Sequence, residues 1–363
     1  MPRVGEVVIE HEAGCDLTAL GAAWRALESD AAPLALFQSW TWLGCLAAER
    51  FPDPVVIRAH IAGRIVGLAL FNRVGGALHL GATGRAAQDS IHVEHNAPLV
   101  AREAPPGLAA AMLRAAWSVR GVGRLVLPGT PEGLAAAAGG VVLRGTSDPA
   151  PFVDLAAIAA GGGDYLATRS ANARGQIRRS MRHFAEEGPL ALSRPASLAE
   201  AEAWCDAMIV LHAESWQRRG KPGAFAEPFM RRFHAALLRD GLVRDDLPAG
   251  AVDPCRITAG EAVLGYLLNF RQGGVAYAYQ SGFRHDEGVA QARPGLVAHV
   301  LAVEDALAAG LARYDFLAGP ARYKLTLSTG AEALAWETRV RALSPTGLAA
   351  IGLGVARAIR LRR

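Results

Sequence analysis

The chain has 363 residues, 51% of them hydrophobic and 20% charged, which is enough for two buried cores and excludes a disordered protein. Four arginines and no acid lie in residues 342–363, so the rest of the chain is formally neutral. A neutral body of this kind is not typical of a general nucleic-acid-binding protein. Four widely spaced cysteines exclude a disulfide framework, and no apolar run approaches the ~20 residues that span a bilayer, so we expect a cytoplasmic protein.

The first half of the chain predicts helices, then a β-hairpin, and then a strand, a helix and a strand. The hairpin is marked by two β-branched runs around Ala62 and Gly63, and the later helix opens with the tripeptide Pro-Gly-Leu. The predicted elements are helices at 16–29 and 37–43, the hairpin at 54–73, a strand at 76–82, a helix at 106–119 and a strand at 123–129.

The second half repeats this order. It predicts helices at 170–187 and 197–217, a hairpin at 256–271, a strand at 274–283, a helix at 294–310 and a strand at 312–319. Gly63 and Gly67 of the first hairpin correspond to Gly260 and Gly265 of the second. The Gly- and Pro-rich residues 145–165 mark the joint, so we expect domains at 1–155 and 156–341 and a separate tail at 342–363.

The start of the helix at 294–310 is a candidate anion site. Arg293, Pro294, Gly295 and Leu296 form its first turn, where free backbone N–H groups and the helix dipole favour a phosphate. An ordinary helix start is the alternative interpretation.

Several segments resemble the GNAT superfamily of acyltransferases, and more narrowly the tandem CelD-like type associated with cellulose and other exopolysaccharide synthesis, distant relatives of the Fem-type aminoacyltransferases. The segments are FQSWTW (37–42), YLATRSANARGQIRRSMRHF (165–184), LHAESWQRRGKPGAF (211–225), YAYQSGF (277–283), RPGL (293–296) and YDFLAGPARYK (314–324). The resemblance implies an α/β (α+β) fold of two tandem GNAT-like domains, each a mixed, mainly antiparallel sheet flanked by helices. It also implies that the pyrophosphate of acyl-CoA lies on the helix at 294–310.

Alignment of the closing glycines, Gly129 with Gly319, compares the two copies. The second copy has Asp315, Tyr323 and Lys324 where the first has small or apolar residues. In a GNAT-like domain these positions lie beside the split that receives the thioester, so the resemblance makes the first copy degenerate and the second catalytic. Asp315 is then a general base or a residue that orients the acceptor, Tyr323 the acid for the thiolate, and Lys324 a phosphate or charge ligand. A strand-end cap, a packed aromatic and a surface cation are the alternatives.

The helix at 171–187 carries arginines beside its apolar face. Ile177 and Phe184 point that face inward, while Arg174 and Arg178 belong to a neighbouring stripe that suits the phosphates of CoA or an anionic acceptor. A solvated face is the alternative.

The acceptor is expected to contact an aromatic and flexible cations where the helix at 197–217 gives way to a loop. Trp216, Arg219 and Lys221 suit a sugar or a polyanion there, and Gln280 follows the aromatics of the central strand and is placed to line the acyl site. Trp216 as a core residue is the alternative.

The tail begins at Ser344-Pro345 and places Leu348, Ile351, Val355 and Ile359 near one helix face. A basic amphipathic helix of this kind predicts either peripheral association with the inner face of an anionic membrane or docking on the protein.

Together these features predict an acetyl-CoA-dependent N- or O-acyltransferase of exopolysaccharide biosynthesis, with acyl-CoA as co-substrate and a sugar or polysaccharide precursor as acceptor. No metal and no nucleic-acid partner are expected. The alternatives are a Fem-like aminoacyltransferase that uses aminoacyl-tRNA, and a non-catalytic, nucleotide-responsive subunit of a polysaccharide assembly.

Overall fold

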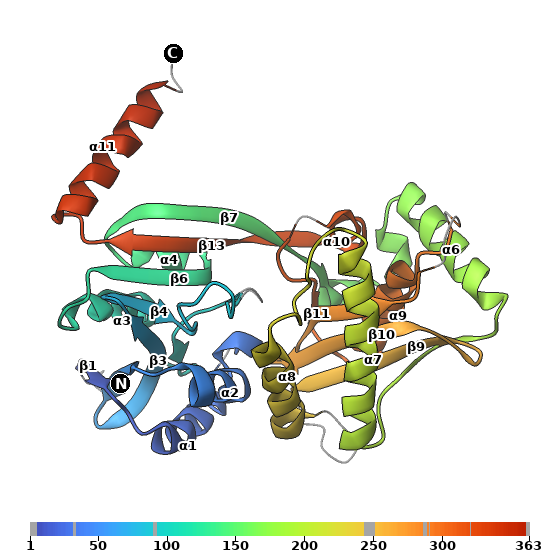
Figure 1. Ribbon diagram of the computed structural model, residues 1–363, viewed down its shortest axis with the longest axis horizontal. Helices are drawn as coiled ribbons and strands as arrows, with labels where there is room; N and C mark the ends of the chain where they lie inside the picture. Colours follow the sequence, from blue (N-terminus) through green and yellow to red (C-terminus); the bar gives the residue numbers. More distant parts are fainter. Residues whose placement is uncertain are drawn as a thin grey trace. The chain divides into compact units, whose positions relative to one another are not determined.

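The computed structural model describes residues 6–31, 34–89, 93–242, 251–285, 289, 291–319 and 321–360, without the side chains of 353–360. The chain forms two compact units, unit 1 from residues 1–148 and 333–363, and unit 2 from residues 149–332. In each unit a mixed, mainly antiparallel sheet is flanked by helices, which confirms the expected fold class (Figure 1). None of the helices described is both long and apolar enough to cross a membrane.

The sheet of unit 1 has the strand order β1-β2-β3-β4-β6-β13, with β5 paired to β3. Its strands are β1 (Val7–Ala13), β2 (Pro54–Ile61), β3 (Arg64–Val74), β4 (Ala77–Leu80), β5 (Leu99–Val100), β6 (Arg124–Pro131), the first part of β7 (Val141–Asp154) and most of β13 (Gly330–Val340). Its helices are α1 (Leu17–Glu28), α2 (Trp40–Arg50), α3 (Leu108–Ala115), α4 (Glu132–Ala137) and α11 (Pro345–Arg360), with short 3-10 turns at Leu36–Gln38 and Ala116–Ser118.

The sheet of unit 2 has the order β7-β12-β11-β10-β9-β8, and the end of β7 supplies its first strand. The other strands are β8 (Leu190–Ser193), β9 (Val252–Ala259), β10 (Ala262–Gln272), β11 (Val275–Phe283) and β12 (Arg313–Asp315). The helices are α5 (Leu155–Ala160), α6 (Ala171–Ala185), α7 (Leu198–Gln217), α8 (Pro228–Gly241), α9 (Pro294–Ala308) and α10 (Arg322–Leu327), with a 3-10 turn at Leu166–Thr168.

Both hairpins form at the predicted turns. Ala62 and Gly63 have positive φ angles between β2 and β3, as does Gly260 between β9 and β10. Such left-handed residues match the right-handed twist of the paired strands, which is why glycine recurs there.

Opposite faces of the unit 2 sheet carry different helices. Ile177 and Phe184 of α6 and Val297 and Val300 of α9 share one buried core with the inward side chains of β9, β10 and β11. The long helix α7 packs on β9–β11 from the other side and crosses them in Figure 1. The inward face predicted for α6 is therefore confirmed.

An ion-pair network holds the far part of the unit 2 sheet to α9. Arg194 and Arg271 each contact both Asp253 and Asp305, with N–O distances of 2.5–2.7 Å. Asp253 is buried on β9 and Asp305 lies on α9. Loss of one partner from a buried pair of this kind typically costs about 3–5 kcal/mol, so the network ties β8, β9, β10 and α9 together.

The units do not follow the two halves of the sequence. Residues 334–340 of β13, from the second half, pair with β6 of unit 1, whereas Phe152–Asp154 of β7, from the first half, pair with β12 of unit 2. This division differs from the expected ranges 1–155 and 156–341. Each unit completes its sheet with a strand from the other half of the chain.

A chain ended at Glu332 tests this exchange. It keeps all of the expected first domain but removes residues 333–340 of β13, so β6 loses its antiparallel partner and the Gly139 carbonyl loses the Arg339 guanidinium. We expect hydrogen exchange to show lost protection of the β6 amides, because unpaired strand N–H groups open to water.

A chain ended at Ala342 is the matched control, since it lacks α11 but retains β13. Equal protection of β6 in the two shortened chains would contradict the assignment of β13 to unit 1.

Candidate functional site

The sheet of unit 2 opens between its two parallel strands. β11 and β12 pair over only three residues, Val275–Tyr277 with Arg313–Asp315, although β11 continues to Phe283. The register with β10 shifts between Leu268 and Asn269, which leaves Tyr279 as the extra residue of a bulge and bends β11. The backbone of β11 beyond Tyr277 therefore does not pair with β12.

The turn after β12 is held by Asp315. Its fully buried carboxylate accepts a hydrogen bond from the Leu317 amide at 2.7 Å and contacts the Arg313 guanidinium at 2.7 Å. Leu317 has a left-handed φ of 60°, which is unfavourable for a leucine and needs such support. The contacts favour the strand-end cap over the general base for Asp315.

Lys324 holds the same turn from the other side. Its Nζ donates to the carbonyls of Leu317 and Ala318 at 3.1 and 2.7 Å. These contacts give the ammonium a positioning role, in place of the surface cation that was the alternative. The turn Phe316–Gly319 is therefore fixed between a carboxylate and an ammonium.

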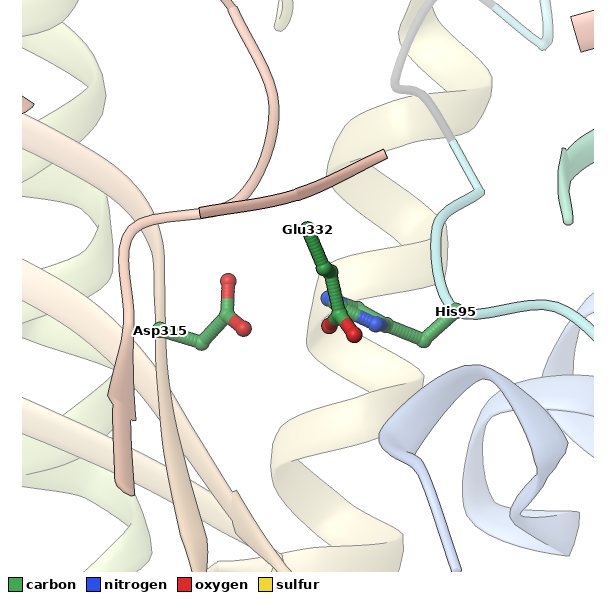
Figure 2. Close-up of side chains that lie close together, drawn as sticks. All are labelled: His95, Asp315 and Glu332. Atoms are coloured by element: carbon green, nitrogen blue, oxygen red, sulfur yellow. The ribbon is translucent and has the colours of Figure 1, made fainter. Parts of the chain in front are cut away.

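Arg313 links Asp315 to Glu332. Its guanidinium lies 3.7 Å from the centre of the Phe152 ring and also contacts Glu332 at 2.6 Å. Figure 2 shows the two carboxylates, Asp315 at the end of β12 and Glu332 at the start of β13. A cation between two acids and against an aromatic face fixes where β12 ends.

Tyr323 stacks on a histidine that the sequence did not single out. Its ring lies 5.0 Å from that of His299 with a 13° angle between planes, and the Nδ1 of His299 lies 3.0 Å from the Tyr314 hydroxyl. Tyr323 keeps 37% of its surface exposed. The one available signal was a lone polar residue in the apolar run of α9.

The protonation states of this stack are set by burial. Partial burial raises the pKa of the Tyr323 phenol above its usual value, and full burial, with the Lys324 charge, lowers the pKa of His299 to about 3. At neutral pH the site therefore presents a phenol, which has a proton to donate, above a neutral imidazole.

Helix α9 begins at Pro294, as predicted. Gly295 packs against the Phe283 ring, and an added Cβ would lie 3.0 Å from it, so glycine permits α9 to approach β11. Leu296 is buried in the core, while Arg293 is exposed and its Nη1 donates to the Gln176 Oε1 at 2.9 Å. The anion site at this helix start stays a prediction.

Helix α6 lies against the start of α9. Besides the Arg293–Gln176 hydrogen bond, the Ser180 hydroxyl donates to the Gln291 carbonyl at 2.5 Å. Of the two predicted arginines, Arg174 donates to the carbonyls of Ala167 and Arg169, whereas Arg178 is exposed. Of these two arginines, Arg178 is therefore the one presented to solvent.

The predicted acceptor residues gather at the end of α7. The Arg219 guanidinium and the Lys221 ammonium lie 5.6 and 5.8 Å from the centre of the half-buried Trp216 ring. His212 connects them to β11, because its Nδ1 pairs with the Ser281 carbonyl at 3.0 Å and its Nε2 accepts from the Ala224 amide at 3.3 Å. Gln280, half-buried, precedes Ser281 on that strand.

Unit 1 has the same parallel pair, but its own chain fills the split. β4 and β6 also pair over three residues, and beyond them the Asn96 side chain donates to the carbonyls of Leu80 and Pro128 at 2.8 and 3.1 Å. The Asn96 amide donates to the Gly129 carbonyl at 3.0 Å. Asn96 thus bridges the ends of both strands.

The filling segment fits only because residue 129 is glycine. A Cβ on Gly129 would lie 2.0 Å from the Val93 carbonyl oxygen, and His95 of the same segment (labelled in Figure 2) has a left-handed φ of 48°. With the closing glycines aligned, Pro128 corresponds to Ala318. Asn96 therefore donates a hydrogen bond in unit 1 to the carbonyl that corresponds to the one Lys324 contacts in unit 2.

Comparison with known proteins agrees with this geometry. Residues 171–325, most of unit 2, match the family model described as an acetyltransferase (GNAT) domain. No curated protein matches the chain in sequence.

Solved structures share the fold along nearly the whole chain. FemX is 10% identical with a TM-score of 0.56, over 90% of this chain and 97% of FemX. L-PGS from Bacillus licheniformis is 12% identical with a TM-score of 0.51, over 94% and 97%. A conserved protein of unknown function from Bacteroides thetaiotaomicron is 10% identical with a TM-score of 0.55, over 92% and 100%. Residues 171–325 of unit 2 are thus similar to an acetyltransferase (GNAT) domain, and the chain shares its fold with these proteins.

Buried histidines predict that the chain loses stability in mild acid. Burial lowers the pKa of His234 to about 4 and that of His299 to about 3, below the usual 6.5. The unfolded chain binds their protons first, so stability is full above about pH 6.5 and falls as the pH drops below it. Preferential protonation of each histidine in the unfolded chain should lower the free energy of unfolding by about 2 kcal/mol at pH 5.

Urea denaturation at pH 7.5 and 5.0 measures this loss. In the variant His234→Phe about 2 kcal/mol of it should disappear. His285→Gln, at an exposed histidine, is the control and should behave as the parent. An equal loss in His234→Phe and the parent would contradict the assignment.

Proposed function

We propose that the chain is an acyltransferase that moves an acyl group, acetyl in the simplest case, from acyl-CoA to an amine or hydroxyl of a sugar or exopolysaccharide precursor. The early end of the β11–β12 pairing, with the Tyr323 phenol on the helix that follows, carries the proposal. The match of this part of the chain to a GNAT domain supports it. The narrower CelD-like type rests on the sequence motifs.

The residues of unit 2 would act in a fixed order. The neutral acceptor attacks the thioester carbonyl, the new C–N or C–O bond forms, and the C–S bond breaks as the tetrahedral intermediate collapses. The departing thiolate takes the Tyr323 proton, and the resulting tyrosinate takes the proton that the acceptor atom has lost. Asp315 and Lys324 keep the turn beside Tyr323 in place.

Donor and acceptor would approach from different elements. Arg293–Leu296 at the start of α9, with Arg174 and Arg178 on α6, are the proposed contacts of the donor phosphates. Trp216, Arg219, Lys221 and Gln280 are the proposed contacts of the acceptor. A cation-flanked indole suits a sugar ring that carries acidic groups.

Aminoacyl transfer from tRNA is the second candidate. The fold shared with FemX and the exposed arginines of α6 favour it. The formally neutral body of the chain counts against it, because tRNA binding calls for a broad basic surface.

Isothermal titration with acetyl-CoA, followed by a thiol-release assay with amino sugars and oligosaccharides, tests the proposal. We expect one donor site per chain, because Asn96 fills the split of unit 1. Tyr323→Phe should keep donor affinity and lower kcat by about 10²–10⁴, since it removes the acid but keeps the ring on His299.

Tyr266→Phe, the same change on β10, is the matched control and should leave turnover intact. Unchanged turnover in Tyr323→Phe would contradict the role of the phenol. No binding of acetyl-CoA or longer acyl-CoAs at millimolar concentration would defeat the acyl-CoA proposal. Turnover with aminoacyl-tRNA alone would select the second candidate, and binding without thiol release would indicate a non-catalytic subunit.

We further propose that the tail holds the protein, which we place in the cytoplasm, at an anionic membrane surface. Helix α11 begins at Pro345, and Leu343, Leu348 and Ile351 are 92%, 58% and 43% exposed. Arg362 and Arg363, and the side chains of Arg357 and Arg360, lie outside the described residues, but all four add positive charge. Exposed apolar residues beside a basic end suit an anionic lipid surface.

Co-sedimentation with vesicles tests this part. The full chain should sediment with phosphatidylglycerol vesicles and less with phosphatidylcholine vesicles, because the arginines need anionic lipid. The chain ended at Ala342 should stay in the supernatant with both. Equal sedimentation of the shortened and full chains would contradict the role of the tail.

A further inference from the structure

Helix α9 places one buried histidine beside the end of β12. His299 is 3% exposed, and its ring lies among aromatic rings of β11, β12, the turn after β12 and α10. These rings are Phe283, Tyr314, Phe316 and Tyr323, with centres 5.0–6.4 Å from that of the imidazole. A phenylalanine would fill such a site without polar partners, whereas the nitrogens of a histidine need them.

One nitrogen of His299 ends a buried hydrogen-bond chain. Its Nδ1 lies 3.0 Å from the Tyr314 hydroxyl, and the Asn269 side chain hydrogen-bonds the same hydroxyl. The Asn269 Oδ1 has no hydrogen-bond partner among the described residues, so its Nδ2 is the atom that donates to the phenol oxygen. The phenol hydrogen is then left for the Nδ1 of His299, which accepts it. The ring proton of His299 consequently lies on Nε2.

This chain fixes the orientation of the imidazole. The Cβ–Cγ torsion of a histidine is broad by itself, but a turn about it here would break the bond to Tyr314. Tyr314 and Asn269 are 0% and 3% exposed, so the ring is anchored to the sheet. Burial and the Lys324 charge lower the pKa of His299, which leaves the ring neutral and its Nδ1 able to accept.

Tyr323 has little else to hold its ring. Helix α10 is six residues long, and of these only Leu327 is buried. The Tyr323 ring lies face to face with the His299 imidazole, 13° from parallel, and meets Phe316 only edge-on at 6.2 Å. The imidazole is therefore the flat surface against which the phenol rests.

We infer that His299 is a positioning residue for acyl transfer, because it holds the Tyr323 phenol beside the opening between β11 and β12. The ring that does this is fixed to the sheet by Tyr314 and Asn269. The inference rests on the proposed function and adds a residue that acts only through Tyr323. A misplacement of about 1 Å can cost about 10²-fold in rate, so a loose support would be felt in kcat.

The thiol-release assay with acetyl-CoA and amino sugars, on the full chain, tests this role. Tyr314→Phe keeps every ring but removes the bond to Nδ1, and should lower kcat about tenfold with the KM for acetyl-CoA unchanged. His299→Leu removes the flat support and should lower kcat about 10²-fold. In a Tyr323→Phe chain neither change should lower kcat further, because the effect passes through the phenol. Tyr314→Phe suffices if His299→Leu folds poorly.

Nuclear magnetic resonance of ¹⁵N-labelled histidine gives a measurement that needs no turnover. The His299 signals, assigned by their absence in His299→Leu or by their change in Tyr314→Phe, should show a protonated Nε2 and an unprotonated Nδ1 in the wild-type protein at neutral pH. Tyr314→Phe should show a mixture of both neutral tautomers, since nothing then favours one nitrogen.

His234→Phe is the matched control, because His234 is also buried and stacked on a tyrosine, Tyr279, but belongs to α8. It should lose stability in the manner described above and keep kcat. Wild-type kcat in Tyr314→Phe and His299→Leu would overturn the positioning role while the acyl-transfer function stands. Losses that multiply with that of Tyr323→Phe, or a proton on the Nδ1 of His299, would also overturn it. Absence of turnover in the wild-type protein would overturn the proposed function together with it.

Discussion

The buried carboxylate of Asp315 determines how the chain leaves the sheet of unit 2. An unpaired charge in this position would be strongly unfavourable, and the Leu317 amide and the Arg313 guanidinium satisfy it. Because the amide contact turns the backbone at Leu317 into a left-handed conformation, β12 ends after three residues while β11 continues. The opening between the two strands, and the position of Tyr323 on α10, both follow from this turn.

The two units satisfy the strand-end carbonyls of their parallel pairs in different ways. A parallel pair that stops after three residues leaves strand-end carbonyls without a partner in the sheet, and such groups need donors. In unit 1 a long connection supplies Asn96 and closes the split. In unit 2 the Lys324 side chain reaches the corresponding Ala318 carbonyl from α10. The strand end is therefore closed by a folded segment in unit 1 and by a single side chain in unit 2.

The candidate site was partly predictable from the sequence. Comparison of the copies singled out Asp315, Tyr323 and Lys324, and the structure brings all three to one turn and the helix after it. The role of each could not be predicted, because their partners are distant in sequence or carry no sequence pattern. His299, which stacks on Tyr323, lies in an apolar helix where a lone histidine carries no motif.

The sequence by itself determined the local structure of this protein. The hairpin turns at Gly63 and Gly260, the helix starts at Pro294 and Pro345, and the inward face of α6 follow from backbone preferences and hydrophobic period, which act within a few residues. Only the tertiary structure decided that β13 completes unit 1 and that β7 enters unit 2. It also decided that Asn96 fills one split and leaves the other open. These outcomes depend on contacts between residues far apart in the chain, whose relative free energies no local pattern records.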